Sequence, residues 1–393
     1  MTIQLHKDMK MLVAAAIFTI TAALLPAEFF SSEKYGWIMD LPEGFRIAEI
    51  TPDEQSVFME HTFMPVRLAV KLYPSTRYAR SDLALEDVLN TLNADGEIEG
   101  FDWNGTPASI SSFAFSLSRD MAKQSGWGLS TTLQKKDMHM IILCYTDADK
   151  ANDCAQFLLS VIDSLSKDES GLRKSGPVSC YGFPSTEFVT SEIKIGEKKI
   201  FTRFDKDASQ ASRFTIDREF AVLSLYAGHE KWKEAWQRYY RLIFRDSYGR
   251  FDECAKDIYG AIYPKAAAAG KDGLQLKLVE QILAWVQGFD YARQKNKADF
   301  EDLISASENK GSDCDSRSLL ACVLLEHFGI KTELFVSREY SHAVFGAAVK
   351  APGAAIKVDG QDYLLGETTS HVKIGLMAQD MSDTEKWIPV DLP

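Results

Sequence analysis

An uninterrupted apolar run at residues 319–325 lies in the C-terminal half of this chain of 393 residues. A helix built from such a run has no polar face, so we expect it to be buried on all sides. A polar stretch at residues 311–316 precedes the run, with Cys314 between two aspartates, and Gly329 follows it. The sequence therefore predicts a loop that delivers Cys314 to the start of a buried helix.

The position of Cys314 suits a thiolate nucleophile. The unpaired N–H groups and the positive dipole end of a helix N-terminus stabilise a thiolate. His342 lies 28 residues further along, in a predicted strand, and can take the thiol proton. Glu367 follows another predicted strand, 25 residues beyond His342, and can orient the imidazole. These residues predict a catalytic triad; the alternative is that Cys314 and His342 are ordinary core residues.

Residues 308–369 resemble the transglutaminase-like cysteine enzymes of the papain-like class. The family pattern is a glycine, an acidic residue, the cysteine and a second acidic residue. An apolar helix ending in Gly-Ile, a strand, a strand with His-Ala and a strand ending in Asp-x-Thr follow. The chain matches this pattern at Gly311, Asp313-Cys314-Asp315, Gly329-Ile330, His342-Ala343 and Thr369. It departs from the pattern in the extra Ser312 and in Glu367, which stands where the family usually has aspartate.

The resemblance implies that Cys314 attacks an amide carbonyl and forms a thioester, while backbone N–H groups at Cys314 hold the oxyanion. We expect water to complete the reaction, as in a peptidase or amidase. One alternative is transfer to an amine, as in a protein-crosslinking acyl transferase. Another is a catalytically inactive binding or envelope assembly protein.

Other residues near the predicted triad have several possible roles. In the family, the helix before the catalytic one packs near the site, which implies that Gln287 and Tyr291 line the cleft or donate to the oxyanion. Surface and core roles are the alternatives for both. His371 is the second candidate for the base, whereas His327 and Cys322 fall in the apolar helix and are expected in the core.

The N-terminal half predicts a separate α/β module at residues 35–165. Strands are expected at residues 56–63, 67–73, 127–133 and 138–145, with Asn104-Gly105 as a hairpin turn. Helices are expected around residues 83–92, with Leu83 on the apolar face, and over residues 150–165. The Leu-Pro-Glu-Gly-Phe segment at residues 41–45 and this element order resemble the Mog1/PsbP-like fold, which is used for binding. The fold class of the chain is therefore predicted as α+β, with antiparallel sheets.

The rest of the chain divides by composition. Residues 166–179 are polar and contain Gly176-Pro177, which predicts a linker. Residues 180–214 predict a small β segment with a hairpin near residues 195–197, and the chain turns helical after Asp217. Residues 215–393 form the predicted transglutaminase-like domain. Within it, two helices present apolar stripes, the first with Trp232, Trp236 and Tyr240 and the second with Val279 and Ile282.

The N-terminus has the pattern of a targeting segment. Lys7 and Lys10 precede an apolar run at residues 11–27, and Leu25-Pro26-Ala27 is a suitable cleavage site. We therefore expect residues 1–27 to be a signal peptide and the protein to be periplasmic or secreted. The alternative is an uncleaved membrane anchor.

Export would place the six cysteines in a compartment where disulfides can form. With Cys314 reactive and Cys322 in the core, four cysteines remain and allow three pairings. Chain position favours Cys144 with Cys154 and Cys180 with Cys254. Four reduced thiols are an equal alternative.

Charge and motifs restrict the partners. The formal net charge is −12, and no basic cluster occurs, which argues against nucleic acid and anionic membrane surfaces. The sequence contains no nucleotide-binding loop, EF-hand loop or zinc-type spacing. We expect no metal or cofactor and a protein or peptide substrate from the envelope or the extracellular space.

Overall fold

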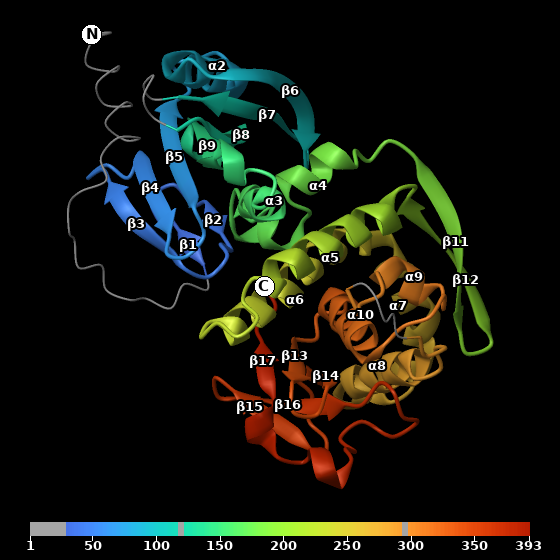
Figure 1. The fold of residues 1–393 in the computed structure, drawn as a ribbon. Helices are drawn as coiled ribbons and strands as arrows, with labels where there is room; N and C mark the ends of the chain where they lie inside the picture. Colours follow the sequence, from blue (N-terminus) through green and yellow to red (C-terminus); the bar gives the residue numbers. More distant parts are fainter. Residues whose placement is uncertain (1–28, 117–121, 293–297) are drawn as a thin grey trace. The chain divides into compact units, whose positions relative to one another are not determined.

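The computed structural model (Figure 1) describes residues 29–116, 122–292 and 298–393. The chain forms two compact units, one ending at Pro184 and one beginning at Ser185. Both mix helices with antiparallel sheets, in agreement with the predicted class. The predicted signal peptide at residues 1–27 lies outside the described residues. Within the part that is described, no helix has the length and apolar character needed to span a bilayer.

The first unit is built on a seven-stranded antiparallel sheet with the order β3-β4-β5-β9-β8-β7-β6. Its strands are β3 (Phe45–Ile50), β4 (Ser56–His61), β5 (Val66–Pro74), β6 (Asp95–Trp103), β7 (Thr106–Phe115), β8 (Gln124–Leu133) and β9 (Met138–Asp147). Asn104 and Gly105 join β6 to β7 with φ of 51° and 77°. Positive φ at both residues matches the twist of a tight hairpin and confirms the predicted turn.

The described residues of this unit also form the helices α2 (Ser81–Leu92), α3 (Ala155–Asp163) and α4 (Pro177–Gly182). The prediction for α2 was wrong in one position, because Leu83 is 38% exposed and Leu85 packs in the core instead. Helix α3 is shorter than predicted. Its expected last residue, Leu165, lies in the short strand β10 (Leu165–Ser166), which pairs with β2 (Ile38–Met39). Strand β2 also pairs with β1 (Phe30–Ser31).

The polar residues 166–179 are part of the first unit. The Asp163 side chain accepts hydrogen bonds from the backbone N–H groups of Val178 and Ser179, at 2.8 and 3.0 Å. The Trp103 indole donates to the Ser175 carbonyl oxygen at 3.2 Å. Composition marked this stretch as a linker, whereas its contacts hold it against the sheet, and the two units divide after Pro184.

The second unit begins with a hairpin of β11 (Phe188–Ile195) and β12 (Lys198–Asp205), as predicted. The helices that follow among the described residues are α5 (Ala208–Ser224), α6 (Trp232–Arg250), α7 (Asp252–Ala267), α8 (Gly270–Val286), α9 (Leu303–Ser307) and α10 (Cys314–His327). Helix α5 begins earlier than the expected turn to helix after Asp217. Its buried residues Ala208, Ala211 and Thr215 repeat at helical spacing, but they are too small or polar to mark an apolar face in the sequence.

The five-stranded antiparallel sheet of this unit has the order β15-β16-β14-β13-β17. Its strands are β13 (Thr332–Ser337), β14 (His342–Ala347), β15 (Ala355–Val358), β16 (Gln361–Gly366) and β17 (Ile388–Val390). Helix α10 packs against β13 and β14 and also contacts α6, α8 and α9. Every residue from 319 to 325, Cys322 included, is 0% exposed, which confirms the predicted buried helix.

All six cysteines are free thiols. Cys180 lies in the first unit, near Asn104, whereas Cys254 is buried in the core of the second unit. Cys144 and Cys154 are both buried, and neither is bonded. The structure therefore has neither of the favoured pairs and agrees with the alternative of reduced thiols.

Candidate functional site

The candidate nucleophile lies at the first residue of α10, as predicted. Asp313 caps this helix, because its side chain accepts a hydrogen bond from the Ser316 backbone N–H at 2.9 Å. Gly311 precedes the cap with φ of 104°, and a Cβ there would lie 2.8 Å from the Cβ of Ala292. Both facts require glycine at this turn. The loop therefore holds Cys314, 5% exposed, at a helix N-terminus.

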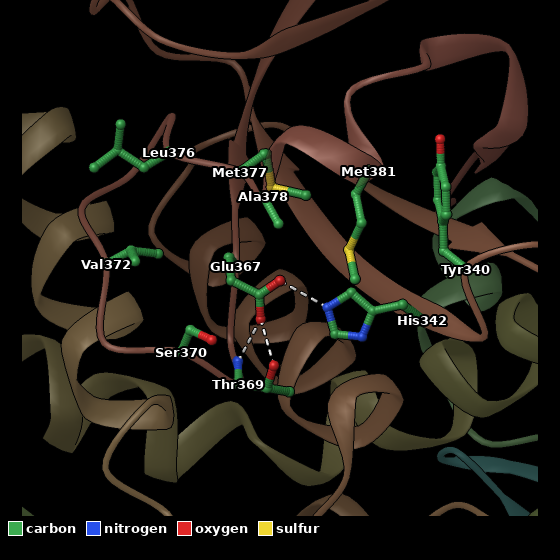
Figure 2. Close-up of a pocket in the computed structure, with 10 residues that line it drawn as sticks. All are labelled: Tyr340, His342, Glu367, Thr369, Ser370, Val372, Leu376, Met377, Ala378 and Met381. Carbon is green, nitrogen blue, oxygen red and sulfur yellow. Dashed lines mark hydrogen bonds and ion pairs between the residues drawn. The ribbon is translucent and has the colours of Figure 1, made fainter.

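His342 and Glu367 meet directly (Figure 2). His342 is the first residue of β14, and Glu367 follows the last residue of β16, a neighbouring strand. The distance between His342 Nε2 and Glu367 Oε2 is 2.7 Å. The backbone N–H and the hydroxyl of Thr369 both donate to Glu367 Oε1 at 2.6 Å. The longer side chain of glutamate thus still reaches the imidazole.

The pKa of Glu367 is lowered by this set of donors. Burial alone would raise its pKa, but the hydrogen bond from His342, the charge of His342 and the donors of Thr369 outweigh burial. An ionised Glu367 accepts the Nε2 proton, so Nδ1 is the free nitrogen whenever the imidazole is neutral.

Helix α10 and strand β14 bring Cys314 close to the start of β14. Ser318, one turn after Cys314, donates to the carbonyl oxygen of Ala343 at 3.2 Å. Burial raises the pKa of Cys314, and a hydrogen bond with the Ala343 backbone opposes this rise. The Cys314 thiol, however, donates to Asp315 Oδ1 at 3.0 Å. Among the described residues, no hydrogen bond joins this thiol to His342.

Asp315 and Tyr240 are site residues that the sequence did not single out. The Tyr240 hydroxyl, from α6, donates to the second carboxylate oxygen of Asp315. Burial raises the pKa of the Cys314 thiol strongly, and the charge and hydrogen bond of Asp315 raise it further. Burial and the Asp315 charge also raise the pKa of Asp313 to about 7. These groups and the hydrogen bond to Asp315 favour the protonated form of the Cys314 thiol.

Gln287 and Tyr291 occupy different surroundings. Gln287 is buried, and its side-chain amide donates to the carbonyl oxygens of Glu367 and Val372 at 2.8 and 2.9 Å. Tyr291 is 54% exposed and forms a backbone bridge with Ser312, two residues before Cys314. Gln287 thus fixes the backbone of Glu367, while Tyr291 lies beside the loop that carries Cys314. Their roles in a cleft or as oxyanion donors stay predictions.

Arg317 ties together three segments of the site and was also missed in the sequence. Its guanidinium is buried and donates to the Ser312 hydroxyl at 2.9 Å, the Phe289 carbonyl at 2.8 Å and the Thr368 carbonyl at 3.2 Å. An arginine inside an apolar helix is the one signal that could have identified it, because such a residue is rarely buried without fixed partners.

His371 and His327, the two other histidines considered in the sequence, have different surroundings. His371 is exposed. His327 stacks on Tyr248 with ring centroids 3.9 Å apart, and its Nε2 lies 3.0 Å from the Tyr248 carbonyl oxygen, in line with the expected core role. Within the described ranges, no group of three or more potential metal ligands converges.

A cavity of about 360 Å³ opens beside the imidazole. It is lined by Tyr340, His342, Glu367, Thr369, Ser370, Val372, Leu376, Met377, Ala378 and Met381. The cavity therefore adjoins the candidate base.

Comparisons with known proteins give weak similarity. No family model matches the chain, and no curated protein does. The chain is similar to a solved PsbP of the cyanobacterium Synechocystis, with 12% identity and a TM-score of 0.29 over 38% of this chain and 97% of that one. It is also similar to the Ran-binding protein Mog1 of Saccharomyces cerevisiae, with 12% identity and a TM-score of 0.28 over 36% and 96%.

These two matches cover the N-terminal part of the chain, where the sequence resembles the same fold. A crystal structure from Bacteroides thetaiotaomicron is similar over 56% of this chain and 76% of that one, with 10% identity and a TM-score of 0.21. All three scores are too low to carry a conclusion about function. The transglutaminase-like resemblance of the C-terminal part stays a prediction.

Proposed function

We propose that the second unit is a thiol hydrolase of the transglutaminase-like type, acting on an amide bond of a protein or peptide. Cys314 is the nucleophile, His342 the general base and Glu367 the residue that orients the imidazole. The observation that carries this proposal is the 2.7 Å contact of His342 Nε2 with Glu367, next to a cysteine at a helix N-terminus. A carboxylate on one ring nitrogen leaves the other free for the thiol proton.

The reaction follows from these positions. The Cys314 proton passes to Nδ1 of His342 while Sγ bonds to the carbonyl carbon and the carbonyl electron pair moves to oxygen. The C–N bond then breaks, and the imidazolium gives its proton to the leaving amine. Water attacks the thioester, its proton passes through the imidazole, and the C–S bond breaks to return the thiol. An amine in place of water would complete acyl transfer.

The thiol must turn from Asp315 toward the imidazole before attack. A substrate that displaces water from the site would favour this change, because the backbone N–H groups of α10 and the imidazole then stabilise the thiolate. During this change, the N-cap Asp313 and the hydrogen bonds of Arg317 hold the loop that carries Cys314 in place.

A second candidate function is supported by the same thiol. Cys314 donates to Asp315, and both burial and the Asp315 charge raise its pKa. These features suit a protein that keeps the fold of the enzymes without turnover and binds a partner instead.

Covalent labelling separates the two functions. Native protein is incubated at neutral pH with an epoxysuccinyl peptide, and the labelled cysteine is identified by mass spectrometry. The hydrolase should be labelled at Cys314, and His342→Ala and Glu367→Gln should slow labelling at least tenfold. Cys180→Ala is the matched control, because Cys180 is a half-buried thiol in the first unit, and it should label like the wild type. Labelling of Cys314 only after unfolding would overturn the hydrolase and favour the binding protein.

We also propose that the protein is exported, on the basis of Lys7, Lys10 and the apolar run at residues 11–27. Sequencing of the N-terminus of the mature protein should begin near Glu28. An intact N-terminus in the membrane fraction would support the anchor, and full-length protein in the soluble cytoplasm would contradict both.

A further inference from the structure

Ser318 lies on the same face of helix α10 as Cys314. The two residues are four positions apart, about one helical turn, so one side chain lies above the other. Ser318 is fully buried, and its hydroxyl donates to the carbonyl oxygen of Ala343 at 3.2 Å. A serine hydroxyl has one proton to donate. This bond therefore uses that proton and leaves the Ser318 oxygen as an acceptor.

Thr368 makes the second contact of this hydroxyl. Its Oγ1 lies 3.3 Å from the Oγ of Ser318, and Thr368 is the donor because the Ser318 proton is directed at Ala343. Thr368 is also fully buried, so bulk water cannot replace either bond. A single serine oxygen thus joins helix α10 to strand β14 and to the segment that follows β16.

Both contact points are next in sequence to a member of the candidate triad. Ala343 follows His342, and Thr368 follows Glu367. Consecutive Cα atoms are about 3.8 Å apart across a planar peptide unit, so a shift of either contact residue moves its neighbour. The hydroxyl of Ser318 therefore locates both members of the ion pair relative to the helix that begins with the nucleophile.

Arg317 adds a further link between the same segments. Its guanidinium donates to the carbonyl oxygen of Thr368 at 3.2 Å and to the hydroxyl of Ser312 at 2.9 Å. Ser312 belongs to the loop that carries Cys314. Two successive residues of α10 thus hold Thr368, one by its backbone and the other by its side chain.

We propose that Ser318 and Thr368 are positioning residues of the thiol hydrolase. Their paired hydroxyls set the distance between the thiol of Cys314 and the imidazole of His342. This role rests on the proposed hydrolase function. It affects the rate because a misplacement of about 1 Å between reacting groups can slow a reaction by about 100-fold. Neither hydroxyl exchanges a proton with the substrate.

Inactivation by an epoxysuccinyl peptide tests the role of Thr368. The measured quantities are the limiting rate of inactivation at Cys314 and the inhibitor concentration that gives half of it. Thr368→Val keeps the shape of the side chain and removes the hydroxyl. It should lower the limiting rate by about tenfold or more and leave the half-saturating concentration unchanged. Thr368→Ser keeps the hydroxyl and should react at the wild-type rate, although the lost methyl group lowers stability. The opposite order of the two variants would assign Thr368 to packing alone and overturn the proposal.

Ser318→Ala breaks the same contact from the side of α10. Its limiting rate should fall as in Thr368→Val, and the double variant should be no slower than Ser318→Ala, because both changes remove one shared contact. Ser318→Ala should have no further effect in a His342→Ala background, since no imidazole is left to position. If Thr368→Val does not fold, as judged by circular dichroism, these comparisons decide the proposal.

Ser307→Ala is the matched control. Ser307 is a buried serine of α9 whose hydroxyl donates to the carbonyl oxygen of Ile304 at 2.7 Å. Its loss should lower stability in urea about as much as Ser318→Ala does, since each variant loses a buried hydroxyl. The limiting rate of inactivation should stay at the wild-type value.

The outcomes separate the positioning role from the hydrolase. Wild-type limiting rates in Thr368→Val and Ser318→Ala would overturn the positioning role and leave the hydrolase standing. An equal slowing by Ser318→Ala with and without His342 would also overturn it, because the change would then act on the fold in general. Labelling of wild-type Cys314 only after unfolding would overturn the hydrolase and the positioning role together.

Discussion

At the scale of single residues, Asp315 favours the protonated form of the candidate nucleophile Cys314. Its carboxylate accepts a hydrogen bond from the Cys314 thiol and another from the Tyr240 hydroxyl. A thiol that donates to a carboxylate is stabilised in its protonated form. The residue next to the nucleophile thus opposes the helix N-terminus, which favours the thiolate.

Replacing Asp315 with asparagine should therefore make Cys314 react at lower pH. The change removes the charge and the anionic acceptor that raise the thiol pKa, while burial continues to raise it. The measurement is the rate of alkylation of Cys314 as a function of pH, whose midpoint should move down. Asp362→Asn, at an exposed position of β16, should leave the midpoint unchanged. An unchanged midpoint in Asp315→Asn would show that Asp315 does not control the thiol.

Sequence reasoning identified residues whose chemistry is local and missed those that depend on distant partners. Cys314 at a helix start and the pairing of His342 with Glu367 follow from motif spacing. Tyr240 contacts Asp315 across 75 positions of the chain, and no local pattern indicates such a contact. Gln287 was singled out, but its bonds to the backbone of the Glu367 segment are visible only in the folded chain.

At the scale of elements, buried charged side chains link helix α5 to helix α6. Glu219 accepts from Arg218 Nε at 2.7 Å and from Arg238 Nη1 at 2.8 Å, and all three side chains are almost fully buried. Such a network fixes the register of the two helices. Removing one member lowers the free energy of unfolding strongly, because the remaining buried charge is less well compensated.

Glu219→Gln should lower the free energy of unfolding by about 3–5 kcal/mol, because it removes a buried anion that binds two buried guanidinium groups. Urea unfolding followed by circular dichroism measures the change. Glu230→Gln, an exposed position between the same helices, should change stability by no more than about 0.5 kcal/mol. A small effect of Glu219→Gln would mean that water or other groups compensate the arginines.

Glu333, in strand β13, should make the stability of the fold depend on pH. The residue is 1% exposed, and burial, followed by the charge of Asp391, raises its pKa from 4.5 to about 8. Between these pH values the folded chain holds a proton that the unfolded chain releases. Stability therefore falls as pH rises through this window and is fully restored below it.

Glu333→Gln should remove this fall, because glutamine has no proton to lose. Urea unfolding at pH about 5 should show similar stability for both proteins, whereas the variant should be the more stable one near pH 8.5. Glu339→Gln, an exposed change just beyond the same strand, should follow the wild type at both pH values. A parallel fall in Glu333→Gln would assign the pH dependence to other groups.

Strong local signals decided which elements were predictable. The turn at Asn104-Gly105 and the helix containing residues 319–325 were clear, because turn chemistry and a continuous apolar run each permit few structures. Leu83 was assigned to the wrong face of α2, since Leu85 lies two positions further and either residue fits part of a helical stripe. The start of α5 was missed because small and polar residues form its buried face.

The whole molecule divides at a short exposed segment. Residues 184–187 are exposed and belong to no helix or strand, and the two compact units meet in sequence there. Composition placed the division earlier, at residues 166–179. Polarity alone does not distinguish a free linker from a polar segment whose backbone is bound, as Asp163 binds Val178.

Limited digestion with a glutamyl endopeptidase should cut first after Glu187. The exposed backbone there can enter a protease without unfolding either unit. Mass spectrometry should find a fragment beginning at Phe188, and this fragment should keep the covalent labelling of Cys314. Glu187→Gln should abolish the early cut. An early cut within either unit would contradict the division.

The methionines that line the cavity beside His342 make the site unequally sensitive to oxidants. Met377 and Met381 are partly exposed, whereas Cys314 is buried and held as a thiol, the form that peroxides oxidise slowly. Conversion of a thioether to a sulfoxide would place a polar, chiral group in the cavity. Mild oxidative stress would therefore make the lining of this cavity more polar while Cys314 is still a thiol, and a methionine sulfoxide reductase would reverse the change.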